Sequence, residues 1–180
     1  SLHPQLRIET QLTDHVRHHL KLNRKEANER AAELLERVGI ENPLNALKRY
    51  PHEFSGGQRQ RIAIAIALAC SPKLLIADEV TTALDVTIQA GILRLIRRLA
   101  DELGLAVLFI SHDLGVISAL ADTVSVMQHG VVVESGDREL VFTNPQHDYT
   151  KALLASLPGA KGGLEKRADL YQMDLSKDLG

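Results

Sequence analysis

Two adjacent carboxylates, Asp78 and Glu79, directly follow a short apolar run and are well placed in the sequence to do chemistry. Carboxylates at the carboxyl end of a buried strand lie where open α/β sheets bind their ligands. At such a position one carboxylate can hold Mg²⁺ while its neighbour orients a water molecule. The pair therefore points to phosphate chemistry.

A glycine-rich turn upstream supplies a second group suited to phosphate. Ser55, Gly56 and Gly57 open a predicted helix. The first backbone N–H groups of a helix have no intrahelical partners and carry the positive end of the helix dipole, so they attract anions. Glycine-rich helix starts are common, and one alone is a weak signal. Together with the two carboxylates, the turn indicates nucleotide hydrolysis.

The apolar pattern predicts the elements that position these groups. Residues 62–70 alternate Ile and Ala like a strand, but their length, their alanine content and the polar residues before them favour a buried helix. The run 74–77 has no polar alternation and predicts a fully buried strand. A helix over 86–103, ended by Gly104, and a second buried strand over 105–110 then complete a right-handed strand-helix-strand unit with a parallel sheet.

Local signals predict the remaining elements. Asn23 and Glu26 form a capping box at the start of a helix that Gly39 ends. The other predicted elements, in chain order, are an amphipathic helix from Leu12 to about residue 22, a short helix over 44–48, a helix capped by Asp113 and running to Ala121, a hairpin of strands 123–128 and 131–134 joined at His129-Gly130, and two short helices within 137–157 separated by Asn144-Pro145.

These motifs resemble the core of an ATP-binding cassette (ABC) ATPase. Four segments match the family in order and spacing: the signature Ser55-Gly56-Gly57-Gln58, the Walker B strand 74–79, the D-loop Ala83-Leu84-Asp85 and the H-loop Ser111-His112-Asp113. Residues 49–54, 81–90 and 144–158 are most similar to the oligopeptide and dipeptide importer branch. The resemblance covers roughly residues 1–158.

The resemblance implies a fold class and a domain organisation. The implied fold class is α/β, a P-loop NTPase-like ABC ATPase core in which helices flank a parallel sheet, with an α-helical signature subdomain. Residues 1–70 would form the signature subdomain and residues 71–158 the RecA-like part of the core that carries Walker B and the H-loop. Residues 159–180 would form a flexible C-terminal tail.

The resemblance also implies the catalytic and metal-binding roles. Asp78 would hold Mg²⁺ through water, Glu79 would act as the general base on the attacking water, and His112 would contact the γ-phosphate of ATP. Without the resemblance, Glu79 is more simply a carboxylate capping a turn and His112 a histidine satisfied at a strand end. Ser111, His112 and Asp113 do not form a hydrolase triad, because adjacent residues on one backbone cannot converge their side chains.

The signature and the D-loop are implied to act across a dimer interface. Ser55, Gly56, Gly57 and Gln58 would bind the γ-phosphate of the nucleotide held by the opposite subunit, and Asp85 would cross the same interface. The site would therefore be complete only in a head-to-tail dimer. One turn after the signature, Arg61 is either solvated or packed near the nucleotide.

The sequence departs from the family pattern in three places. It contains no G-x-x-x-x-G-K-[ST] run and no Q-loop glutamine in its proper context. Ser1-Leu2-His3-Pro4 resembles the residues that follow the Q-loop, so we expect a C-terminal portion of a cassette, without Walker A, that is inactive by itself. Val80 stands where the family usually has proline, which frees the backbone φ and adds an N–H donor.

Composition excludes several classes of function. The 180 residues, 44% of them hydrophobic, suit one globular domain, and a net charge of −2 gives no footprint for nucleic acid. There is no apolar run long enough to span a membrane, and the first ten residues lack the apolar segment expected of a signal peptide. The single cysteine, Cys70, excludes an intrachain disulfide. His15, His18 and His19 favour a solvated helix face over a metal site, because only Asp14 stands near to complete a coordination shell.

The predicted function is that of the ATP-binding subunit of an importer for peptides or similar small solutes. By resemblance, its cofactors would be ATP and Mg²⁺, and its partners would be transmembrane permease subunits and a second ATP-binding subunit, identical or not. It would lie peripherally on the cytoplasmic face of the cell membrane and reach the membrane only through the permease. Two alternatives stay open: a soluble ABC ATPase of translation or repair, and a non-enzymatic interaction module.

Overall fold

The computed structural model describes residues 2–80 and 85–156, and these divide into two compact units. The N-terminal unit ends at Leu108 and the C-terminal unit begins at Phe109. The predicted domain boundary between residues 70 and 71 stays a prediction. The predicted tail at residues 159–180 and the D-loop residues Ala83 and Leu84 lie outside the described residues.

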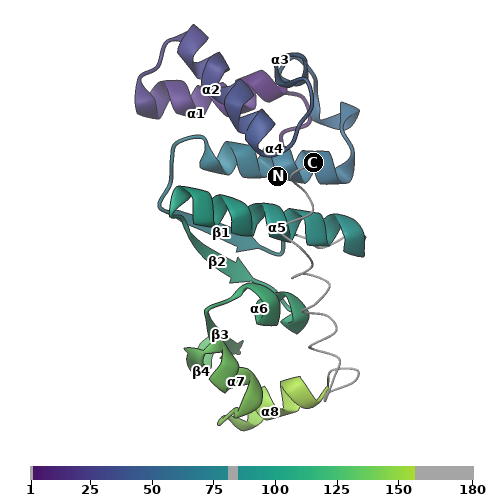
Figure 1. The fold of residues 1–180 in the computed structure, drawn as a ribbon, viewed down its shortest axis with the longest axis vertical. Coiled ribbons are helices and arrows are strands. Elements are labelled where there is room, and N and C mark those ends of the chain that lie inside the picture. Colours follow the sequence, from purple (N-terminus) through teal and green to yellow (C-terminus); the bar gives the residue numbers. More distant parts are fainter. Residues whose placement is uncertain (1, 81–84, 157–180) are drawn as a thin grey trace. The chain divides into compact units, whose positions relative to one another are not determined.

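Helices dominate the N-terminal unit (Figure 1). In chain order they are α1 (Ile8–Leu20), α2 (Arg24–Arg37), α3 (Pro43–Ala46), a 3₁₀ turn (Pro51–Glu53) and α4 (Gly56–Leu68). Helices α1, α2 and α4 pack against one another. Their shared core contains the fully buried side chains of Ile8, Leu12, Val16, Leu35 and Ile62. The run that imitates a strand, residues 62–70, is therefore helical up to Leu68, as predicted.

The start of α1 differs from the prediction, whereas the start of α2 agrees with it. The α1 helix begins at Ile8, ahead of the predicted Leu12, because the N–H groups of Ile8 and Glu9 donate to the carbonyls of Arg49 (3.0 Å) and Leu47 (2.8 Å). At α2, Asn23 and Glu26 form the predicted capping box. The short α3 begins at Pro43, one residue before the predicted Leu44, and ends at Ala46.

A strand-helix-strand unit follows α4. It consists of β1 (Leu74–Asp78), α5 (Val86–Leu103) and β2 (Ala106–Ile110), and β1 and β2 form a parallel sheet. The predicted inner face of α5 is buried at Ile92, Leu95, Ile96 and Leu99. Leu103 is an exception with 45% of its surface exposed. Gly104 ends the helix in the left-handed region (φ +61°), as expected of a C-terminal glycine.

The two strands are not fully buried, which corrects the prediction from their apolar sequences. Side chains alternate between the two faces of a strand, and the structure covers only one face of β1. Leu75 and Ala77 are buried, whereas Leu74 and Ile76 are 51% and 60% exposed. In β2, Leu108 and Ile110 are likewise about half exposed. The apolar runs therefore predicted the strands correctly. They did not predict that the described residues cover only one face of each strand.

Between Phe109 and residue 156, the C-terminal unit contains a hairpin and three short helices. These are α6 (Leu114–Leu120), the antiparallel strands β3 (Thr123–Gln128) and β4 (Val131–Asp137), α7 (Arg138–Thr143) and α8 (Asp148–Ala155). His129 (φ +50°) and Gly130 (φ +81°) form the predicted two-residue turn, in which both residues need a positive φ. The pairing of β3 with β4 shifts register after Val126. The β4 strand ends at Asp137, beyond the predicted end at Glu134. The core is built around Val124, Val126 and Val141.

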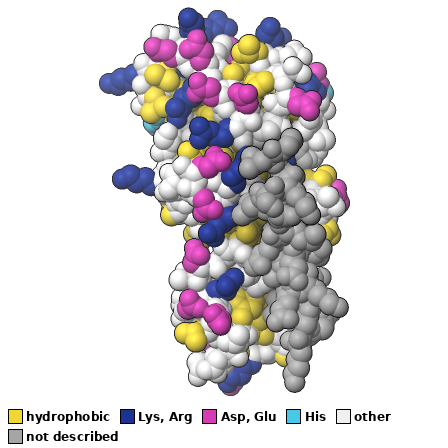
Figure 2. Space-filling view, in the orientation of Figure 1, with side chains coloured by type: hydrophobic (Ala, Val, Ile, Leu, Met, Phe, Trp, Pro, Cys, Tyr) yellow, Lys and Arg dark blue, Asp and Glu magenta, His cyan; other side chains and the backbone are white. Residues whose placement is uncertain are grey.

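The surface carries charges of both signs. On the face that Figure 2 shows, and outside the grey atoms, basic side chains (dark blue) and acidic side chains (magenta) are interspersed. This mixture agrees with the near-neutral net charge of −2. Within residues 2–80 and 85–156, no helix is both long enough and apolar enough to cross a membrane.

Candidate functional site

The signature turn is a capped helix start. Ser55 Oγ accepts a hydrogen bond from the backbone N–H of Gln58 (3.2 Å), and Gln58 Oε1 accepts one from the backbone N–H of Ser55 (3.0 Å). This reciprocal capping box was available in the sequence as Ser-x-x-Gln. Because it engages both side chains, it fixes the orientation of the first turn of α4, in which Ser55 and Gln58 are exposed and Gly57 is buried. The anion-attracting N–H groups of this turn are therefore held in place by local sequence.

Gly57 lies against α5, a contact that sequence reasoning missed. A Cβ atom placed on Gly57 would lie 2.9 Å from Cγ2 of Ile88, closer than real contacts allow. Packing inside this unit therefore needs glycine at this buried position. A phosphate that approached the backbone here would need it for the same reason, because glycine has no side chain in the way. No local pattern relates position 57 to position 88, so only the tertiary structure could reveal the contact.

Asp85 caps the helix that follows Walker B. Its Oδ1 accepts a hydrogen bond from the N–H of Ile88 (3.0 Å), which begins α5 after the D-loop. The structure therefore gives Asp85 a local role at the surface of the N-terminal unit. The predicted role of Asp85 across a dimer interface stays a prediction.

The carboxylate pair ends β1 as predicted, with both side chains exposed. Glu79 has φ +46°, in the left-handed region that residues other than glycine seldom adopt. That conformation costs on the order of 1–2 kcal/mol. Strained backbone of this kind concentrates at functional sites, where the surrounding structure holds a side chain in one direction. Lys21, Asn42, Ser71 and His129 also have a positive φ, so this conformation fixes the direction of Glu79 without by itself marking a functional residue. Val80 beside it is half-buried.

Asp78 is an exposed carboxylate, and its predicted role in holding Mg²⁺ through water stays a prediction. Within residues 2–80 and 85–156, no three His, Cys, Asp or Glu side chains gather as a protein-only metal site. Mg²⁺ fits this arrangement, because it is typically bound through one or two carboxylates together with water and substrate phosphates. An exposed carboxylate at the end of a strand meets that requirement. On α1, His15, His18 and His19 are all exposed.

The H-loop segment is organised by its own backbone. Ser111 Oγ accepts from the N–H of Asp113 (3.0 Å), and Asp113 Oδ1 accepts from the N–H of Gly115 (2.9 Å) to cap α6. The Ser111 and Asp113 side chains are thus engaged locally. His112 is exposed and belongs to the C-terminal unit, whereas Asp78 and Glu79 belong to the N-terminal unit. The contact of His112 with the γ-phosphate stays a prediction.

Arg61 packs between helices and is not simply solvated. Its Nη1 donates to the carbonyl of Val38 (2.9 Å) at the end of α2. Burial lowers the pKa of Arg61, and the nearby charge of Arg98 contributes further. Arg98 itself donates to the carbonyl of Arg37 (3.0 Å) at the same helix end. Two cations thus stabilise the negative end of the α2 dipole and tie α2 to α4 and α5.

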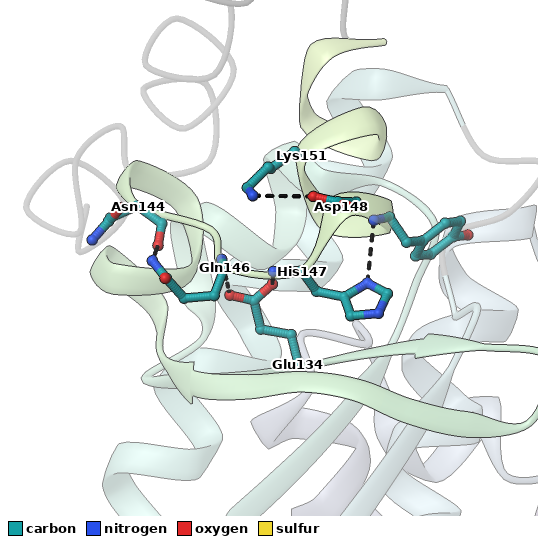
Figure 3. A network of polar contacts seen from close by, with 7 residues as sticks. Glu134, Asn144, Gln146, His147, Asp148 and Lys151 are labelled. Atoms are coloured by element: carbon teal, nitrogen blue, oxygen red, sulfur yellow. Dashed lines mark hydrogen bonds and ion pairs between the residues drawn. The ribbon is translucent and has the colours of Figure 1, made fainter.

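A polar network in the C-terminal unit anchors the start of α8 (Figure 3). The Glu134 carboxylate accepts from the backbone N–H groups of Gln146 (2.7 Å) and His147 (3.1 Å). The hydrogen bond from Gln146 is the largest cause of a lowered pKa of Glu134, and the backbone N–H and the charge of His147 contribute further. The His147 ring in turn accepts from the N–H of Tyr149 (3.2 Å). These contacts hold α8 beside β4.

We expect Glu134→Gln to lower the stability of the C-terminal unit at neutral pH. Because folding lowers the pKa of Glu134, its stabilisation is present above the unfolded pKa of about 4.3 and is lost as pH falls through the folded value. Urea midpoints of both proteins between pH 7 and pH 3 measure the effect. The two midpoints should differ at pH 7 and converge below pH 4 or so. Glu33→Gln on α2 is the control, and a constant difference across the range would contradict the assignment.

Two family descriptions match this chain. Residues 1–82 match the ABC transporter domain, and residues 133–175 match the oligopeptide/dipeptide transporter C-terminal region. The first range includes the signature and Walker B residues, and the second includes the Glu134 network.

Curated relatives are about half identical to the chain. It is 51% identical over 158 residues to the oligopeptide transport ATP-binding protein OppD of Bacillus subtilis, which covers 88% of this chain and 44% of that protein. It is 50% identical over 167 residues to the glutathione import ATP-binding protein GsiA of Escherichia coli K12, which covers 92% of this chain and 27% of that protein. The chain thus spans about half, or less, of the length of these relatives.

Solved structures confirm the predicted α/β ABC ATPase fold class. The chain is similar to an ATP-binding cassette in a dimeric, post-hydrolysis state bound to ADP and Pi, with a TM-score of 0.65 and 28% identity over 77% of this chain and 59% of that one. A second dimeric structure of a bacterial ABC transporter cassette gives a TM-score of 0.64 and 29% identity. From the capped signature helix, the Walker B strand, the two family matches and these relatives together, residues 1–82 belong to the ABC transporter domain family and residues 133–175 to the oligopeptide/dipeptide transporter C-terminal region.

Proposed function

We propose that this chain supplies the signature, Walker B and H-loop parts of an ATPase that drives import of peptides or similar small solutes. The observation that carries the proposal is the end of β1, where Asp78 and Glu79 are exposed and Glu79 is held in a left-handed turn. A strained carboxylate directly after a strand is suited to act on a water molecule beside bound phosphate. The names of the relatives, which import oligopeptides or glutathione, support the solute class.

Each motif residue has a role in this proposal. Glu79 takes the proton of the attacking water as general base, and His112 stabilises the charge that builds on the γ-phosphate. Asp78 would hold Mg²⁺ through water, and the ion would neutralise phosphate charge. These steps need ATP bound to a P-loop, which the 180 residues do not contain. The proposed activity is therefore that of a complete cassette, defined as this chain joined at Ser1 to a segment that carries a P-loop and a Q-loop.

The proposed assembly is a head-to-tail dimer docked on a permease. Ser55, Gly56, Gly57 and Gln58 would bind the γ-phosphate of ATP held by the second subunit, with Asp85 crossing the same interface. The dimeric state of both similar cassette structures supports this arrangement. Transmembrane permease subunits would place the protein peripherally at the cytoplasmic face of the membrane.

ATP hydrolysis by the complete cassette, with and without a peptide permease in liposomes, tests the proposal. We expect Mg²⁺-dependent phosphate release, and uptake of labelled oligopeptide or glutathione only when ATP and the permease are both present. Uptake that continues without ATP, or a complete cassette that binds ATP but never hydrolyses it, would contradict the proposal.

Gly57→Asp is expected to abolish hydrolysis by the complete cassette while ATP binding to the same subunit changes less than about twofold. The substitution adds negative charge at a helix start that is proposed to face the γ-phosphate bound to the other subunit. Phosphate release and equilibrium binding of a fluorescent ATP analogue are the two measurements.

Gly57→Ala separates charge from packing in this test. It also places a Cβ atom 2.9 Å from Ile88 but adds no charge. We therefore expect Gly57→Ala to retain part of the activity that Gly57→Asp loses. Equal losses of binding and hydrolysis in Gly57→Asp would show that the signature has a different role.

A further inference from the structure

Ile88, in the first turn of α5, contacts two of the motif segments. Its backbone N–H donates to Asp85 Oδ1 (3.0 Å), and its side chain lies against Gly57. A Cβ atom placed on Gly57 would meet Cγ2 of Ile88 at 2.9 Å and Cδ1 at 3.9 Å. Ile88 therefore links two motif residues: its backbone binds Asp85, and its side chain packs against Gly57.

This contact has little freedom to adjust. Ile88 is β-branched, and in a helix such a side chain strongly prefers one χ1 rotamer, so its Cγ2 is placed by the α5 backbone. Gly57 is buried and has no side chain that could yield. Ile88 itself is 37% exposed, so the coupling comes from this one contact and not from a closed core. A shift of the first turn of α5 toward Gly57 therefore presses on the first turn of α4.

Both turns are themselves fixed to their helices. Ser55 and Gln58 close the start of α4 with two reciprocal hydrogen bonds. Asp85 closes the start of α5 through Ile88. The contact between Gly57 and Ile88 thus joins two capped helix starts, and not two loose loops.

We propose that Ile88 is a positioning residue for ATP hydrolysis, which keeps the signature turn in register with Asp85 so that both reach the partner subunit's nucleotide together. This inference rests on the proposed function. Ile88 does not touch the reacting atoms and acts through Gly57 and Asp85. Truncating its side chain therefore lowers the rate of hydrolysis and leaves ATP binding to the same subunit unchanged.

The packing is tested in the 180-residue chain by a double-mutant cycle with Gly57→Ala and Ile88→Ala. The added Cβ at position 57 needs space that Ile88→Ala creates, so the double variant loses less stability than the sum of the two single losses. Urea midpoints measured by circular dichroism provide the four values. Strictly additive losses would show that Ile88 and Gly57 are not coupled and would overturn the inference.

The kinetic role is tested in the complete cassette, below the unfolding midpoint of each variant. Ile88→Ala lowers kcat by about tenfold or more and changes KM for ATP by less than about twofold, because small misplacements of aligned groups slow the chemical step. Ile88→Val keeps Cγ2 and restores most of kcat. Leu103→Ala, an aliphatic truncation at the far, exposed end of the same helix, leaves both constants unchanged.

Failure of this inference can be told from failure of the proposed function. Hydrolysis that depends on Glu79 but is unaffected by Ile88→Ala overturns the positioning role alone. A complete cassette without any hydrolysis that depends on Glu79 overturns the proposed function and this inference with it. A tenfold loss in Ile88→Val equal to that in Ile88→Ala would show that the effect does not depend on the Cγ2 contact with Gly57, which valine keeps, and would overturn the positioning role.

Discussion

Replacing Glu79 with glutamine in the complete cassette is expected to slow ATP hydrolysis by about 10²-fold or more while ATP remains bound. Glutamine keeps the size and the hydrogen-bonding capacity of the side chain but cannot take a proton from water. The substitution changes only the end of the side chain, so the left-handed backbone at this position (φ +46°) is retained. The loss therefore reports the basicity of the carboxylate and not a change in the turn.

Phosphate release and size-exclusion chromatography in ATP measure this result. The variant should accumulate as an ATP-bound dimer because closure no longer leads to hydrolysis. Glu102→Gln is the control, since it neutralises another exposed carboxylate of the N-terminal unit, one that pairs with Arg98 on α5. Near-normal turnover in Glu79→Gln would refute the assignment of the general base. An equal loss in Glu102→Gln would indicate a general effect of charge.

The 180-residue chain by itself is expected neither to bind ATP tightly nor to hydrolyse it. A P-loop supplies the backbone N–H groups around the phosphates, a lysine on the β- and γ-phosphates and a hydroxyl on Mg²⁺, and no such motif occurs in the sequence. Asp78 and Glu79 would then have no bound phosphate to act on. Calorimetric titration of Mg-ATP into the chain should show no micromolar binding, whereas the complete cassette should bind.

Self-association should accompany this inactivity. The strands β1 and β2 expose Leu74, Ile76 and Leu108 by half or more of their surface, and exposed apolar faces and strand edges promote association. Sedimentation velocity should detect oligomers that Ile76→Lys reduces. Micromolar ATP binding, or turnover that Glu79→Gln abolishes, would show that other residues of this chain form a phosphate site.

The sequence by itself determined the elements whose signals are local. The Asn23–Glu26 capping box predicted the start of α2, because its partners are only three residues apart and form within one turn. Gly104 predicted the end of α5, because few other residues adopt its left-handed conformation without strain. The apolar stripe of α5 likewise predicted its buried face, since helical periodicity is a property of the local chain. The order of the motifs was sufficient for the family and for the fold class.

Only the tertiary structure decided what depends on distant segments. The α1 helix starts at Ile8 because carbonyls near residue 48 satisfy its first N–H groups, and nothing near Ile8 in sequence announces this. The same holds for Arg61, whose burial depends on the end of α2.

The structure also decided how many faces of each strand are covered. An apolar run records which residues favour burial, but the elements packed against each face determine whether burial occurs. Leu74 and Ile76 therefore remain exposed in a strand whose sequence predicts burial. For the same reason, the requirement for glycine at position 57 became clear only when Ile88 was seen beside it, since packing joins residues that the sequence separates.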